Sequence, residues 1–157
     1  MKAPITKSTL LATKTVNLRT LLSNGTHYEV PAYQRDYSWT EEHWEDLWDD
    51  ILEIERTGRA HYMGAIVLTE QNVDDYRIID GQQRLATLSI LVLAALRSLQ
   101  DWIANGVQPD ENGQRRDLLR NAFLGGLHPV TLRTAPKLTL NTSNRRFYEG
   151  TLLTLQN

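Results

Sequence analysis

The sequence contains no cysteine, which excludes disulfide bonds and thiolate chemistry. Its four histidines are scattered and show none of the paired spacings that are typical of metal sites. It has neither a G-x-x-x-x-G-K-[ST] phosphate-binding loop nor a G-x-S-x-G nucleophile elbow. The familiar signatures of P-loop NTPases, serine hydrolases and histidine-based metal hydrolases are therefore all missing.

Long hydrophobic runs are scarce as well. The most apolar stretch, residues 85–96, contains Thr87 and Ser89 and is too short to span a bilayer. The first residues, MKAPITKSTLLATK, lack the continuous apolar segment of a signal peptide. We therefore expect a cytoplasmic protein with no membrane partner.

Neither sign of charge dominates, since the net charge is −2, and this excludes a generic nucleic-acid coat protein. The charges are unevenly placed: residues 29–56 hold ten acids against two arginines, whereas residues 114–146 hold seven basic residues against Asp117 alone. Either these are two solvated faces of opposite sign, or the C-terminal third contacts phosphate or an acidic neighbouring domain. Under the second interpretation, the candidate DNA or partner contacts are Arg115, Arg116, Arg120, Arg145 and Arg146.

The chain does contain enough apolar residues for one folded domain. Its 157 residues and 41% hydrophobic content fit a single globular unit. Residues 1–14 lack periodicity and predict a loose N-terminal arm, which leaves 15–157 as the domain. Apolar residues recur at helical spacing over 40–58 and over 82–104. The second of these helices is apolar on most sides over its first turns, so we expect it at the centre of the core.

Extended segments accompany these helices. HYMGAIVLTE and YRIIDG predict two strands that pair as a hairpin, and PKLTL predicts a further strand. VQPDENG predicts a loop, and helices are predicted over 114–126 and from 141 onward. The predicted fold class is mixed α/β (α+β), with a small sheet packed on the long central apolar helix.

The segment IIDGQQR is polar where a strand should lead directly into the long helix. Orphan N–H groups and the positive end of the helix dipole make such a junction a natural anion site. Gly81 allows a close backbone approach. Gln82 and Gln83 offer amide donors, and Arg84 offers a charge suited to phosphate. Asp80 has three open roles: an N-cap, an indirect Mg²⁺ anchor, or a group that orients an attacking water. An Asp N-cap followed by solvated side chains is the competing interpretation.

Two other segments bear on this site. PAYQRDYSW gathers Tyr33, Arg35 and further aromatic residues, a planar and cationic set that could stack a base and hold phosphate. The alternative is an aromatic satellite core with Arg35 paired to Asp36 or Glu29. Gly64 stands where a strand is predicted to begin, which indicates either the close approach of a backbone or ligand, or a bulge.

Four sequence motifs follow one another along the chain in this order: VPAYQRDYSW, WEDLWDDI, HYMGAIVL and RIIDGQQRLATLSILVLAAL. Together they resemble the N-terminal domain of GmrSD-type proteins, which are modification-dependent restriction and anti-phage enzymes with a DGQQR signature. The likeness is dense over residues 16–104 and looser through PKLTLNTSNRRFYEG. It implies a ParB/sulfiredoxin-like fold with a nucleotide pocket at a strand-to-helix turn. It also implies NTP binding and hydrolysis, coupled to DNA cleavage by an HNH-type nuclease domain. We expect Mg²⁺ to bridge the phosphates of the nucleotide.

The resemblance also implies roles for individual residues. It assigns Arg84 and Gly81 to phosphate, Asp80 to the orientation of water or metal, and Arg35 to pocket closure. The predicted catalytic set is Asp80, Gln82, Gln83 and Arg84, and the predicted nucleotide-binding set is Tyr33, Gln34, Arg35, Gly64, Gly81 and Arg84. No HNH nuclease site is visible in these 157 residues, so the resemblance implies a nuclease domain that lies C-terminally or acts in trans.

Two other functions stay open at this point. The first is a non-catalytic module that senses modified DNA through the basic C-terminal third. The second is a dimerisation domain of a homo-oligomer, with the long apolar helix partly at a subunit interface. We favour an NTP-binding regulatory domain, because only that function explains why an acid, a glycine, two amides and an arginine stand together at a helix start.

Overall fold

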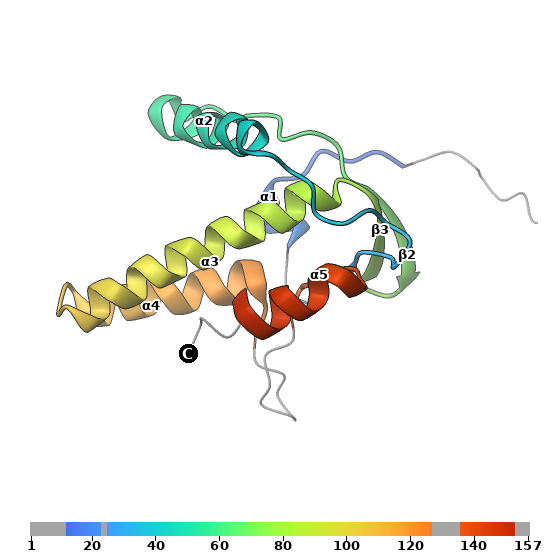
Figure 1. Cartoon of the computed structure of the whole chain (residues 1–157). Helices are drawn as coiled ribbons and strands as arrows, with labels where there is room; N and C mark the ends of the chain where they lie inside the picture. Colours follow the sequence, from blue (N-terminus) through green and yellow to red (C-terminus); the bar gives the residue numbers. More distant parts are fainter. Residues whose placement is uncertain (1–11, 23–24, 127–135, 153–157) are drawn as a thin grey trace, which may run out of the picture.

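A four-stranded sheet and one long helix form the framework of the molecule (Figure 1). The structure is a computed structural model that describes residues 12–22, 25–126 and 136–152. Its strands are β1 (His27–Glu29), β2 (Val67–Asn72), β3 (Asp75–Asp80) and β4 (Leu138–Thr139). Its α-helices are α1 (Leu18–Leu21), α2 (Glu41–Thr57), α3 (Gln82–Ala104), α4 (Pro109–Leu119) and α5 (Thr142–Phe147). Two π-helical turns follow α4 and α5, namely η1 (Arg120–Leu124) and η2 (Tyr148–Leu152). The predicted mixed α/β class is confirmed, while the ParB/sulfiredoxin-like arrangement stays a prediction.

The sheet has the order β2-β3-β1-β4. β1 runs parallel to both β3 and β4, and β2 runs antiparallel to β3, which confirms the predicted hairpin. The predicted start of β2 at residue 61 is wrong, because β2 begins at Val67 and Gly64 lies before it with a φ of +94°, outside the β region. The carboxyl ends of the three parallel strands lie along one edge of the sheet. After β1 the chain passes through α2 and β2 to β3 on one side of it, and after β3 it returns through α3 and α4 to β4 on the other side.

The predicted central helix is confirmed as α3, which runs diagonally across the molecule with α4 beside it (Figure 1). Its N-terminal half contributes Leu85 and Ala86 to a core cluster that includes residues of β1, β3 and β4. Its C-terminal half contributes Leu93 and Leu96 to a second cluster with Leu124 of η1. Of the described helices, α3 alone has the length and apolar composition to cross a bilayer, and its place in both clusters is that of a core helix.

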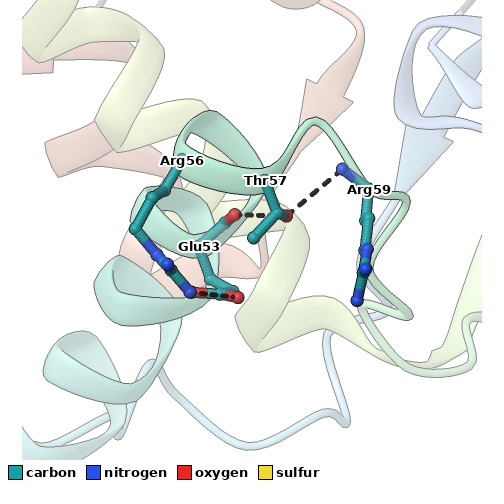
Figure 2. Close-up of polar contacts among 4 residues, drawn as sticks. All are labelled: Glu53, Arg56, Thr57 and Arg59. Atoms are coloured by element: carbon teal, nitrogen blue, oxygen red, sulfur yellow. Dashed lines mark hydrogen bonds and ion pairs between the residues drawn. The ribbon is translucent and has the colours of Figure 1, made fainter.

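Helix α2 has the predicted bounds. Thr40 is its N-cap, and Gly58 ends it with a left-handed φ of +65°. At its C-terminal end the Thr57 hydroxyl donates to the Glu53 carbonyl (2.7 Å) and accepts from the Arg59 N–H (3.2 Å), as Figure 2 shows. Leu47 is its one buried residue, and the helix lies apart from the sheet (Figure 1).

The predicted loop over 107–113 is wrong, because α4 begins within it. Pro109 occupies the first helical turn, where its fixed φ suits a helix and its missing N–H costs nothing. Asp110 and Glu111 follow in the first turn, where the helix dipole favours acids.

Lys137 anchors the start of β4: it is buried, and its ammonium group donates to the Ala122 carbonyl (2.9 Å).

Candidate functional site

Three segments leave the carboxyl edge of the sheet next to one another. β1 continues into residues 31–39, here called the YQR loop, which turns tightly where the Gln34 N–H donates to the Pro31 carbonyl (3.0 Å). β3 continues through Gly81 into α3, and β4 continues into Asn141, the N-cap of α5. In a partly parallel sheet, a ligand site is expected at this edge.

The two glutamines of the signature hold the YQR loop. The Gln82 Nε2 donates to the Arg35 carbonyl (3.1 Å), and the Gln83 Nε2 donates to the Asp36 carbonyl (3.1 Å). The Gln83 Oε1 accepts from the Ser38 N–H (2.9 Å). Both glutamines are more than nine-tenths buried, so the interpretation of solvated glutamines is wrong. The amide donors that the sequence offered to phosphate are used here by the loop backbone.

Further tethers reach the loop from β3 and α5. The Gln34 Nε2 donates to the Ile79 carbonyl (3.0 Å) at the end of β3. The Asn141 Nδ2 lies within hydrogen-bonding distance of the Gln34 carbonyl (3.0 Å), the Arg35 carbonyl (3.3 Å) and the Asp36 carboxylate (3.1 Å). The end of β3 and the starts of α3 and α5 therefore all hold the YQR loop.

Tyr37 anchors the far end of the loop. The Thr87 hydroxyl donates to the Gln83 carbonyl (2.9 Å), so the Tyr37 hydroxyl is the donor in its 2.7 Å bond to the Thr87 Oγ1. Burial raises the pKa of the Tyr37 phenol above its ordinary value, which keeps this donor protonated. The aromatic residue of the loop that packs inward is thus Tyr37, whereas Tyr33 is 73% exposed.

A small pocket with a cavity volume of about 20 Å³ lies between the loop and the starts of α3 and α5. Its lining residues are Val30, Arg35, Tyr37, Gln82, Gln83, Ala86, Leu140, Asn141 and Asn144. Pockets for whole drug-sized ligands typically measure about 300–1,000 Å³. This pocket is far smaller and has room for about one water molecule or one small ligand group.

One atom in the pocket wall lacks a partner. The Gln82 Oε1 is buried and accepts no hydrogen bond from the described residues. Because the Arg35 carbonyl can only accept, the amide nitrogen of Gln82 must face it, and the oxygen is left over. An unsatisfied buried acceptor is costly, so this one marks a place for a donor such as water or a ligand hydroxyl.

The predicted alternative that Arg35 pairs with Asp36 or Glu29 is wrong. Glu29 lies 3.8 Å from Arg77, on β3. Within the part of the chain that the structure describes, the exposed Arg35 side chain forms no ion pair. The charge of Arg35 at the pocket wall is therefore not paired with a carboxylate of the described residues.

Arg84 and Gly64 meet on another side of the α3 start. A Cβ atom on Gly64 would lie 2.8 Å from the Arg84 guanidinium, so a larger residue here would displace this group from its present position. The Arg84 Nη1 lies 3.4 Å from the Ala65 carbonyl, and no carboxylate of the described residues pairs with Arg84. The close approach predicted at Gly64 is made by Arg84, which is not among the residues that line the pocket.

Of the three open roles for Asp80, the N-cap is wrong. Gly81 itself is the N-cap residue of α3, with a φ of +90°, and no side chain caps this helix. The exposed Asp80 carboxylate accepts only from the Gly81 N–H (2.8 Å) among the described residues. A Cβ atom on Gly81 would lie 3.0 Å from Ile66 and 3.1 Å from the Ala65 carbonyl oxygen, so the close approach there is by neighbouring protein.

The predicted DNA or partner contacts lie outside the pocket and most have partners in the chain. Arg116 and Arg120 share Asp117 (3.0 and 3.4 Å), and Arg145 pairs with Glu149 (3.0 Å). Arg115 donates to the Asn112 Oδ1 (2.6 Å). Arg146 has no ion pair within the described ranges. Their contact with DNA or a partner stays a prediction, as does any role of Arg133 and His128, which lie outside the described residues.

A second polar cluster crosses the sheet away from the pocket. His27 bonds through its Nδ1 to the Asp75 carboxylate (2.9 Å) and through its Nε2 to the Thr139 hydroxyl (2.9 Å). The hydrogen bond from His27 lowers the pKa of Asp75 below its ordinary value. Thr139 is buried and does not line the pocket described above, and the two bonds of His27 tie β1 to β3 and β4.

Sequence reasoning missed Asn141 and Asn144. The signal was an asparagine directly after a predicted strand and before a predicted helix, which is a typical N-cap position. The sequence could place Asn141 at the start of α5, but it could not show that its side chain reaches the YQR loop, more than a hundred residues earlier.

The fold and the site define a small mixed α/β domain with a polar pocket at the carboxyl edge of its sheet. A family model described as the GmrSD restriction endonuclease, N-terminal domain, matches residues 18–151, and the chain belongs to this family. The matched span contains the YQR loop, the DGQQR signature and Asn141. Membership places the chain in a restriction system of antiviral defence. A search of the curated proteins returned no match.

Proposed function

We propose that this domain binds a nucleoside triphosphate at the carboxyl-edge pocket and hydrolyses it, and that this reaction regulates DNA cleavage by a separate HNH-type nuclease domain. The observation that carries the proposal is the buried Gln82 Oε1, which has no partner among the described residues, in a pocket whose wall also holds Arg35, which forms no ion pair with any of them. A buried acceptor beside a free cation fits a ligand or bound water that supplies a hydrogen-bond donor next to negative charge.

The start of α3 supports phosphate binding. No side chain of the described part of the chain caps the helix, so its first N–H groups and the positive end of its dipole are available to an anion. Because the pocket is too small for a whole nucleotide, we assign the phosphates to the rim, between Arg35 and the segment that contains Gly81 and Arg84. Arginine is suited to this role because its fork matches phosphate oxygens in pairs.

The two glutamines take different roles in this proposal. Gln83 uses both amide atoms to hold the loop, so we assign it to structure. The Gln82 Oε1 accepts a hydrogen bond from the attacking water and so orients it. The water oxygen attacks the terminal phosphorus while the bond to the bridging oxygen breaks. The products are a nucleoside diphosphate, inorganic phosphate and a proton released to solvent.

Asp80 fits a Mg²⁺ ion that is held chiefly by phosphate and water. No group of three or more His, Cys, Asp or Glu side chains gathers among the described residues, so they offer no all-protein cage. A single exposed carboxylate at the phosphate end of a site is the usual protein contribution to such an ion. When bound, Mg²⁺ would neutralise charge on the phosphate oxygens.

A thermal-shift titration with ATP, GTP, CTP and UTP in Mg²⁺ tests the proposal. A nucleotide at a hundred times its Kd should stabilise the chain by about 2.7 kcal/mol, a shift of a few degrees. Arg35→Ala and Arg84→Ala should each reduce the shift, whereas Arg97→Ala, at an exposed position in the C-terminal half of α3, should leave it unchanged. If no nucleotide shifts the wild type, the proposal is wrong.

A further inference from the structure

The backbone carbonyls of Gln34 and Arg35 are held by side chains at the starts of α3 and α5. From α3, the Gln82 Nε2 donates to the Arg35 carbonyl (3.1 Å). From α5, the Asn141 Nδ2 lies 3.0 Å from the Gln34 carbonyl and 3.3 Å from the Arg35 carbonyl. The backbone at Arg35 is thus fixed, while its side chain stays exposed at the pocket wall without an ion pair among the described residues.

Asn141 is suited to holding this loop. It is 4% exposed, and each of its amide atoms has partners. Its Oδ1 accepts from the Asn144 N–H (3.2 Å) and side-chain amide (2.8 Å), which orients the nitrogen toward the loop. Its third contact, with the Asp36 carboxylate (3.1 Å), is a bond to a charged acceptor, which is stronger than a neutral one.

From this geometry we infer that Asn141 is a positioning residue of the nucleotide site, which sets Arg35 against the anionic part of the ligand through the backbone of the YQR loop. The inference rests on the proposed function. Asn141 also begins α5, so the same side chain joins the position of Arg35 to the start of that helix. Occupation of the pocket and the order of the α5 start should therefore depend on one another.

The variant Asn141→Ser separates the two roles of this residue. Serine is about as good an N-cap as asparagine, so α5 keeps its start. Its hydroxyl is one bond shorter and cannot replace the amide nitrogen that reaches the loop. The change adds no charge, so weaker binding would not come from repulsion of phosphate. Asn17→Ser is the matched control, because Asn17 caps α1 by the same contact, with the Thr20 N–H (2.8 Å).

Nucleotide affinity measured by calorimetry gives the first test. Asn141→Ser should raise Kd by about ten- to a hundredfold, because misplacement of a binding group by about 1 Å has effects of that order. Asn17→Ser should leave Kd unchanged. In an Arg35→Ala background, Asn141→Ser should change Kd by less than about twofold, because the residue acts through Arg35. An effect of full size in that background would contradict the inference.

Amide hydrogen exchange gives a second readout that needs no ligand. Asn141→Ser should speed exchange at residues 34–38 while α5 stays as protected as in the wild type. Equal exchange in both proteins would overturn the inference. The two proposals fail differently: a wild type that binds no nucleotide overturns the proposed function and this inference together. A wild type that binds, with Asn141→Ser unchanged in Kd, overturns this inference alone.

Discussion

The two halves of α3 are built from different chemistry. The N-terminal half buries Gln82, Gln83, Thr87 and Ser89, and three of these four side chains bond to the YQR loop or to the residues that anchor it. The C-terminal half buries Leu93, Leu96 and Leu99 and packs against α4 and η1. Buried polar groups cost free energy unless they are paired, so their concentration at one end indicates a site rather than simple packing.

The largest effect should come from the apolar half. Leu96→Ala removes a side chain that is 4% exposed in the second core cluster, and it should destabilise the chain by about 2–5 kcal/mol, measured by urea unfolding. Nucleotide affinity, measured where the variant is folded, should not change. Leu118→Ala, at a position 71% exposed, is the matched control and should stay within about 0.5 kcal/mol. A specific loss of affinity in Leu96→Ala would contradict the division of α3.

In the N-terminal half of α3, replacing a buried glutamine by methionine, a side chain of similar volume, should affect the YQR loop as well as stability. Gln83→Met leaves the Asp36 carbonyl and the Ser38 N–H without partners, at a cost of about 1–3 kcal/mol if they stay buried. Amide exchange in the YQR loop should accelerate at the same time. Gln100→Met is the same substitution in the C-terminal half of α3, where it removes the acceptor of a bond from Arg116. If both variants leave the hydrogen exchange of the YQR loop unaltered, Gln83 does not hold the loop.

A pair of glycines separates backbone strain from crowding at the site. Gly64 and Gly58 both have left-handed φ values, so alanine at either position should cost about 1–2 kcal/mol in strain. A Cβ atom at Gly64 would also meet the Arg84 guanidinium at 2.8 Å, whereas nothing lies within 4 Å of one at Gly58. We therefore expect similar stability losses by thermal unfolding and a loss of nucleotide affinity in Gly64→Ala alone. Equal affinities would place Arg84 outside the site.

The smallest effect concerns the cluster away from the pocket. His27 lowers the pKa of Asp75 in the folded chain, so the folded state binds protons less readily there than the unfolded state does. The contribution is present above the ordinary aspartate pKa of about 3.9 and is lost as the pH falls through the lower folded value. Asp75→Asn should therefore lose less stability than the wild type between about pH 5 and pH 3, measured by urea midpoints.

The neighbouring turn residue Asp74 supplies the control for this pH experiment. Asp74→Asn should follow the wild-type curve, because the His27 ring bonds to Asp75 and not to the Asp74 side chain. Parallel curves for all three proteins would show that the His27–Asp75 contact adds no pH dependence.

The sequence predicts the elements whose signals are local. Thr40 and Gly58 bound α2 as expected, and the apolar run sets α3. The same local signals fail where two rules compete. VQPDENG reads as a loop from its proline, asparagine and glycine, yet Pro109 stands at the one helical position that proline favours.

The site is harder to predict, because its contacts join distant parts of the chain. The DGQQR signature marks the correct junction, but two adjacent glutamines at a helix start do not reveal that one is fully paired and the other is not. The difference depends on the carbonyls of residues 35 and 36, which lie some forty-seven positions away. Asn141, which joins the loop to α5, depends on a parallel β1–β4 pairing that no local pattern specifies.

Amide hydrogen exchange with and without saturating nucleotide and Mg²⁺ tests the central claim most directly. The claim is that a nucleotide binds where the three parallel strands end. We expect joint protection of residues 34–38, 81–86 and 141–144, with α2 and the C-terminal half of α3 unchanged. Protection confined to α2 or α4, with calorimetry showing binding, would place the nucleotide elsewhere and contradict the account.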